Sequence, residues 1–140
     1  YDEIQHISGG IILRNFDFLQ NASLWIKTDS LIPSKAFFNM VSNQFCNTNV
    51  VKAKELTDYE IESEQNKFLR SADGRLLLHA YVKKRQGDEI ILVTEESKHD
   101  NDNKIYRKIP FCCDQMAIRC CNVPYFLKNS VGFRLSDFLH

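Results

Sequence analysis

The sequence predicts an α/β fold, specifically a three-layer α/β/α sandwich with a mainly parallel sheet. The first observation is the apolar run at residues 90–94 (IILVT), which is rich in β-branched side chains and shows no alternation with polar ones. Such a run is typical of a parallel strand buried on both faces. The second observation is the order helix, strand, helix, strand, helix in the later part of the chain, which favours a sheet covered by helices on both sides.

The first elements of the chain give the weakest signals. Residues 30–33 (SLIP) are expected to form a short buried strand that ends at proline. Ser34 is then expected to cap a helix that continues to about Phe45 and carries an apolar stripe.

Two capping signals define the middle of the chain. Thr57 and Glu60 have the spacing of a capping box, in which each side chain satisfies an unpaired backbone N–H of a helix start. Ser71 offers the next N-cap, and Asp73 falls in the first turn of the helix that it opens. The sequence QGD at residues 86–88 is expected to end that helix.

The last elements follow a polar loop at residues 97–104. Pro110 suits the first turn of a helix that ends near Ala117. Residues 119–123 form another short apolar run, which predicts a second strand, and Pro124 opens a final helical turn.

The length and composition predict one globular domain, which we expect to span residues 1–140. The 18 Lys and Arg residues equal the 18 Asp and Glu residues in number. Because no net charge attracts nucleic acid over a long range, an RNA-binding site would have to be local. No apolar run approaches the roughly 20 residues of a membrane-spanning helix, so no membrane partner is expected.

The five cysteines favour a reducing compartment and a cytoplasmic protein. Their number is odd, and two adjacent pairs, Cys112 with Cys113 and Cys120 with Cys121, suit disulfides badly. We expect buried thiols that pack as small apolar side chains. A zinc site is the alternative, although neighbours on a strand point to opposite faces.

Three carboxylates are expected to meet at one edge of the sheet. In right-handed helix-to-strand units the helix N-termini and the strand C-termini share an edge, which places Asp73 beside Glu95 and Glu96. Carboxylates held together repel one another, and Mg²⁺ or Mn²⁺ relieves that repulsion and can generate a hydroxide for phosphoryl displacement. The basic residues are expected to be dispersed elsewhere. Alternatively, Asp73 only complements the helix dipole, and the two glutamates form a solvated strand exit.

Three stretches, SADGRLLLHA (71–80), EIILVTEES (89–97) and KIPFCC…IRCCNVPYFL (108–127), carry a resemblance to a known family. Together they resemble PIN-domain nucleases, especially a bacterial PIN-like group of uncharacterised proteins. PIN domains typically show an acidic residue that opens a helix and then a hydrophobic strand that ends in Val-Thr and one or two acidic residues. The resemblance covers about half of the chain.

The resemblance implies a PIN-like fold and a ribonuclease that depends on Mg²⁺ or Mn²⁺, often the toxin of a toxin–antitoxin pair. By position, Asp73 matches the helix-opening metal ligand and Glu96 the strand-end ligand, with Glu95 beside it as a further catalytic and metal-binding candidate. Lys108 is the candidate for a phosphate contact, its alternative being a solvated lysine. The implied partners are RNA, an antitoxin or another protein, and a second copy of the chain.

The N-terminal half departs from the PIN pattern, which begins with a hydrophobic strand that ends in Asp. Asp17 (NFDFL) is the nearest substitute as a metal ligand, and Asn39 stands where the family has an acidic residue. Because the chain begins with Tyr1, we expect that the missing strand lies upstream or comes from another chain. The alternative function is a catalytically inactive PIN-like module that binds protein or RNA. A doubly wound domain without nuclease ancestry is the remaining alternative.

Overall fold

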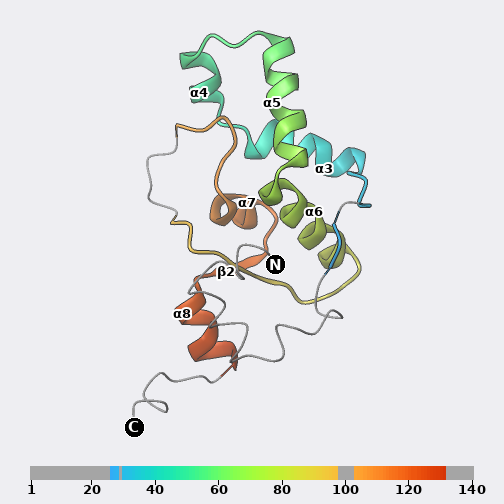
Figure 1. Cartoon of the computed structure of the whole chain (residues 1–140), viewed down its shortest axis with the longest axis vertical. Helices are drawn as coiled ribbons and strands as arrows, with labels where there is room; N and C mark the ends of the chain where they lie inside the picture. Colours follow the sequence, from blue (N-terminus) through green and yellow to red (C-terminus); the bar gives the residue numbers. More distant parts are fainter. Residues whose placement is uncertain (1–25, 29, 98–102, 132–140) are drawn as a thin grey trace, which may run out of the picture. The chain divides into compact units, whose positions relative to one another are not determined.

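The computed structural model describes residues 26–28, 30–97 and 103–131 of the chain. By its internal contacts the chain divides into two units, residues 1–30 and residues 31–140. Every helix and strand described below belongs to the second unit (Figure 1). The predicted metal ligand Asp17 lies outside the described residues.

The second unit combines short helices with one small sheet. In chain order its elements are α3 (Lys35–Met40), the π-helix η4 (Val41–Phe45), α4 (Thr48–Ala53), α5 (Asp58–Arg70), α6 (Ala72–Arg85), β1 (Ile91–Val93), α7 (Ile109–Gln115), β2 (Arg119–Cys121), α8 (Val123–Phe126) and the π-helix η5 (Leu127–Val131).

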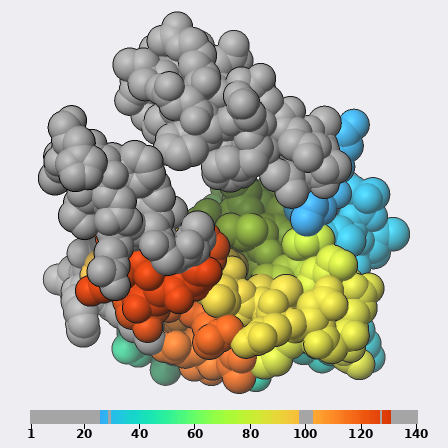
Figure 2. All heavy atoms as spheres, turned by 90° about the horizontal axis from the view of Figure 1, so that it is seen from below, coloured from blue at the N-terminus to red at the C-terminus, as the bar shows by residue number. Residues whose placement is uncertain are grey.

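The sheet pairs β1 with β2 in parallel, with Leu92 opposite Cys120. Helix α7 lies between the two strands in the chain, as a parallel connection requires. Figure 2 shows one face of the molecule on which α8 (red), the residues near β2 (orange) and those near β1 (yellow) adjoin. The predicted α/β character is therefore confirmed, and the described residues contribute two strands to the sheet.

Local side-chain chemistry starts three of the helices where the sequence predicts. Ser34 accepts a hydrogen bond from the Phe37 N–H at 3.2 Å and caps α3. Thr57 and Glu60 form both hydrogen bonds of the capping box at the start of α5. Ser71 caps α6. These caps are confirmed because they depend only on residues within three positions of one another.

Two predictions about strands are wrong, and one helix was not foreseen. Residues 30–33 form no strand, and Ile32 is 88% exposed. Strand β1 has three residues, of which only Leu92 is buried, so the expected burial on both faces does not occur. Ile91 is only partly buried because it lines a surface pocket, together with residues of the C-terminal helical segment. Helix α4, between the predicted helices, carries no buried residue, and so it gives no apolar stripe to recognise.

The core is built around aromatic and sulfur-containing side chains. Its fully buried members come from α3, η4, α6 and α7: Phe37, Val41, Phe45, Leu77, Cys112 and Cys113. All five cysteines are free thiols, as predicted; Cys112 and Cys113 are buried, and the other three are partly buried. Burial raises the pKa of the Cys113 thiol, which stays protonated and packs as an apolar group. In the part of the chain that the structure describes, no helix is long and apolar enough to cross a membrane.

Candidate functional site

Asp73 is positioned by the tight turn between α5 and α6, in which Ser71 alone connects the two helices. The Ser71 hydroxyl donates to the Phe68 carbonyl at 2.6 Å and accepts from the Gly74 N–H at 3.1 Å. A Cβ at Gly74 would lie 2.0 Å from the Phe68 carbonyl oxygen, so only glycine allows the two helices to approach this closely. Asp73 is held in the exposed first turn of α6, and its carboxylate makes no hydrogen bond or ion pair with any described residue.

The end of strand β1 directs two neighbouring carboxylates to two different helices. The Ile109 N–H donates to Glu96 Oε2 at 2.9 Å, so Glu96 caps α7. The Val123 N–H donates to Glu95 Oε1 at 2.9 Å, so Glu95 caps α8. Both bonds place a negative charge at the positive end of a helix dipole, which stabilises the two helix starts. The predicted solvated strand exit is therefore a pair of structural caps.

The segment before α7 is fixed by pairing with the end of η4. The Asn47 N–H donates to the Ile105 carbonyl at 2.7 Å, and the Arg107 N–H donates to the Phe45 carbonyl at 2.9 Å. Between these bonds Tyr106 stacks on Phe68 of α5, with ring centroids 4.6 Å apart. Burial, followed by the nearby Cys46 and Glu64, raises the pKa of Tyr106, so its phenol is neutral at physiological pH.

These segments enclose a pocket of about 410 Å³, which we call the Glu96 pocket. Its lining residues come from the end of α4, helix α5, the start of α6, the segment after β1 and the segment that leads into α7. The course of these elements can be followed in Figure 1. Its acidic lining residues are Glu64, Asp73 and Glu96, its basic ones are Lys54, Lys67, Lys104, Arg107 and Lys108, and the others are Phe68, Ser71, Asn103, Ile105 and Tyr106.

The Glu96 pocket brings together some of the predicted site residues and not others. Asp73, Glu96 and Lys108 line it, although they come from three separate segments of the chain. Glu95 does not line it, because its carboxylate is turned to α8. Asn39 is exposed on α3 and is not a lining residue either.

The charge of the pocket corrects the predicted separation of acidic and basic residues. Five of the 18 basic residues line the pocket together with its three acidic ones, so the basic residues are not all dispersed away from the predicted site. One of these charges is compensated locally, since Lys67 Nζ lies 2.5 Å from Glu64 Oε1. Another is held in place, because Arg107 donates to Asn47 Oδ1 at 3.1 Å and lies over the ring of Phe111. The basic residues of the pocket come from segments that lie far apart in the sequence, so no sequence pattern indicates that they form a cluster.

Asp73 and Glu96 are the lining carboxylates whose oxygens could bind a hard divalent cation. Asp73 has both oxygens available, and Glu96 keeps Oε1 without a hydrogen-bond partner among the described residues. Mg²⁺ in phosphate-binding sites commonly uses one or two carboxylates, with waters and phosphate oxygens as the other ligands. A site made wholly of protein ligands is not found, because no group of three His, Cys, Asp or Glu side chains suited to a metal exists among the described residues. The predicted zinc alternative therefore gains no support.

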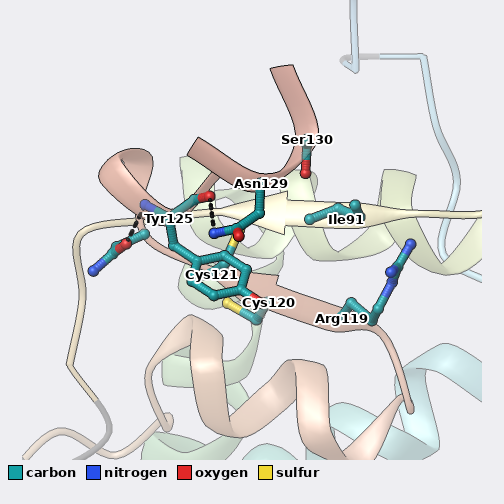
Figure 3. Close-up of a pocket in the computed structure, with 8 residues that line it drawn as sticks. Ile91, Arg119, Cys120, Cys121, Tyr125, Asn129 and Ser130 are labelled. Carbon is teal, nitrogen blue, oxygen red and sulfur yellow. Dashed lines mark hydrogen bonds between the residues drawn. The ribbon is translucent and has the colours of Figure 1, made fainter. Parts of the chain in front are cut away.

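A second pocket, of about 600 Å³, lies beside the sheet. Figure 3 shows Tyr125 and Asn129 of the C-terminal helical segment around a hollow that Cys120, Cys121 and Ile91 also line. Asn129 Nδ2 donates to the Tyr125 carbonyl at 2.9 Å, so the polar groups here partly satisfy one another. Of the predicted site residues that the structure describes, none lines this pocket.

Residues 15–132 match the model of a family described as a domain of unknown function (DUF4411). The matched region includes every described helix and strand and every residue that lines the Glu96 pocket. No curated protein and no solved structure matches the chain.

Proposed function

We propose that this chain, which belongs to the DUF4411 family of domains of unknown function, is a PIN-like ribonuclease that depends on Mg²⁺ or Mn²⁺. The finer α/β/α sandwich of a PIN domain is part of the same proposal. One observation carries it: Asp73 and Glu96, the two acidic positions that match the PIN pattern, line a single pocket together with five basic residues.

The basic residues of the pocket suit an RNA backbone. Lys and Arg side chains bind phosphates largely by charge. Lys54, from the end of α4, lines the same hollow as Lys104 and Lys108, which come from the segment that leads into α7. Lys108 is the N-cap residue of α7, so it stands directly before the helix start that Glu96 caps. A neutral protein can thus bind RNA through a local cluster, as its composition requires.

The carboxylates supply the second half of the proposed chemistry. Asp73 and Glu96 are the residues that would hold the divalent ion, which when bound lowers the pKa of a water and offsets charge on the scissile phosphate. Glu96 is positioned for this by its bond to the Ile109 N–H, and Asp73 by the rigid turn at Ser71. The basic side chains bind and orient the phosphates on either side.

A catalytically silent RNA-binding module is the second candidate. It is favoured by the use of Glu96 as a helix cap and by the pairing of Glu64 with Lys67. Among the described residues that line the pocket, these bonds leave Asp73 as the one carboxylate with both oxygens unbonded. Both candidates use the same basic residues, so they differ only in cleavage.

Cleavage and binding of a labelled single-stranded RNA separate the two candidates. The nuclease proposal expects the RNA to be cut in Mg²⁺ or Mn²⁺ and to remain intact, but bound, in EDTA. Binding without cleavage under all three conditions would support the silent module and contradict the nuclease. If the RNA is neither bound nor cleaved, both candidates are overturned.

A further inference from the structure

A further hollow, distinct from the pocket beside the sheet, adjoins the Glu96 pocket on the outer face of α5. It has a volume of about 420 Å³ and is lined by Tyr59, Glu62, Ser63, Asn66, Lys67 and Arg70, which together we call the α5 surface. Lys67 lines both hollows, so the α5 surface continues from the Glu96 pocket.

The α5 surface is separate from the face of α5 that packs into the protein. On the packed face Gln65 is buried and donates to Ser42 Oγ at 2.6 Å, and Phe68 stacks on Tyr106. On the outer face Tyr59 is 81% exposed and makes no hydrogen bond or ring contact with any described residue. Most of its ring is therefore accessible.

The α5 surface carries basic side chains, whose charge is opposite to that of a nucleic-acid backbone. Arg70 forms no ion pair with any described residue, and Lys67 is 68% exposed despite its pair with Glu64. Glu62 is the one acidic side chain among the residues that line the surface. Tyr59 lies eight residues before Lys67 on α5, so the α5 surface has an exposed aromatic ring at one end and two basic side chains toward the other. Stacking of bases on aromatic rings and contacts of basic side chains to phosphates are the two ways in which proteins bind single-stranded nucleic acid.

We propose that a single-stranded RNA bound in the Glu96 pocket continues along the α5 surface, where Lys67 and Arg70 contact its phosphates and a base stacks on Tyr59. This inference rests on the proposed function for the identity of the ligand. Eight residues of helix separate Lys67 from Tyr59, which corresponds to about 12 Å at about 1.5 Å per residue. Tyr59 is thus out of reach for an RNA that only fills the Glu96 pocket.

The test is the affinity for labelled oligouridines of two lengths, about 4 and about 12 nucleotides, within the usual range of binding-site sizes. Fluorescence anisotropy is measured in EDTA, so that cleavage does not enter. Tyr59→Ala is expected to weaken binding of the longer RNA about 5-fold to 150-fold, since loss of one stacked base costs this much. Tyr59→Phe keeps the ring and is expected to bind like the wild type. Tyr125→Ala, at a tyrosine that is 60% exposed and outside both surfaces, is the matched control and leaves binding unchanged.

The inference is overturned if Tyr59→Ala binds the longer RNA as tightly as the wild type, or if it weakens both lengths equally. The first result would show that the α5 surface does not bind RNA. Failure of this inference can be distinguished from failure of the proposed function. A wild type that binds the longer RNA through Tyr59 but never cleaves it contradicts the nuclease alone. A wild type that cleaves RNA with no contribution from Tyr59 contradicts this inference alone.

Discussion

The Ile109 N–H donates to Glu96 Oε2 at 2.9 Å, so a carboxylate three residues after the end of β1 caps the start of α7. This bond gives one side chain both a structural and a proposed metal-binding role. Glu96→Gln keeps an oxygen that can accept the bond but removes the charge. Glu96→Ala removes both and leaves the N–H of Ile109, a residue that is 6% exposed, without its acceptor.

We therefore expect Glu96→Ala to lower the free energy of unfolding by about 1 to 2 kcal/mol and Glu96→Gln by clearly less. Both variants are expected to lose RNA cleavage. Urea denaturation measures the first effect and a cleavage assay the second. Full cleavage by Glu96→Gln would show that the charge is not needed and would contradict the proposed metal-binding role.

Gly74→Ala tests the close approach of α5 and α6 that positions Asp73. In an exposed helix, alanine would be more stable than glycine by about 1 kcal/mol. Here the added Cβ meets the Phe68 backbone carbonyl at 2.0 Å, so we expect a net destabilisation of about 1 to 3 kcal/mol. The sign of the change in urea denaturation decides between the two effects. A more stable variant would mean that the helices separate without cost.

The capping box at the start of α5 predicts a dependence of stability on pH. Hydrogen bonds from the Thr57 backbone and then from its side chain lower the pKa of Glu60 below its ordinary value of 4.5. A lowered pKa in the folded state stabilises the protein at pH values above 4.5, and this contribution is lost as the pH falls through the folded-state pKa.

Thermal unfolding of the wild type and Glu60→Gln at a series of pH values measures this contribution. The wild type is expected to be the more stable protein near pH 7, and the difference is expected to shrink below pH 4.5. A difference that stays constant across this range would contradict the charge-dependent cap.

Lys54 and Lys52 provide a matched pair for the basic character of the Glu96 pocket. Both are exposed lysines at the end of α4, but only Lys54 lines the pocket. Lys54→Ala is expected to weaken RNA binding in EDTA and to reduce the slope of log affinity against log salt by about 0.7, the value for one phosphate contact on a single strand. Lys52→Ala is expected to leave affinity and slope unchanged. Equal effects of the two variants would indicate a general charge effect and no local site.

Sequence analysis predicts the elements that short-range chemistry determines. Ser34, Thr57 and Ser71 cap helices through bonds to residues three positions away, so their signals are visible in the chain. The parallel pairing of β1 with β2 is also predicted, because the helix between two apolar runs requires it. The three-residue length of β1 is not, since it depends on which side chains the tertiary structure covers.

The candidate site is only half visible in the sequence for the same reason. Asp73 and Glu96 are found because the edge of an α/β sheet gathers helix starts and strand ends. The opposite directions of Glu95 and Glu96 are not predictable, because each depends on which helix start lies nearest. Lys54 and Lys104 join the pocket only through the pairing of residues 45–47 with residues 105–107, and no spacing along the chain signals this contact.

The central claim is that the Asp73 carboxylate takes part in metal-dependent RNA cleavage and does not serve only the helix dipole. Asp58 is the matched control, since it is an exposed acidic residue in the first turn of α5 and does not line the Glu96 pocket. Asp73→Asn and Asp58→Asn remove the same favourable dipole interaction, worth about 0.3 to 1 kcal/mol each.

The decisive measurement is the rate of cleavage of a labelled single-stranded RNA in Mn²⁺ by the wild type and these two variants. We expect Asp58→Asn to cleave at the wild-type rate. We expect Asp73→Asn to be slower by at least about 100-fold, because even groups that merely orient a metal ligand contribute about 10- to 100-fold. Equal rates for Asp73→Asn and Asp58→Asn would contradict the account.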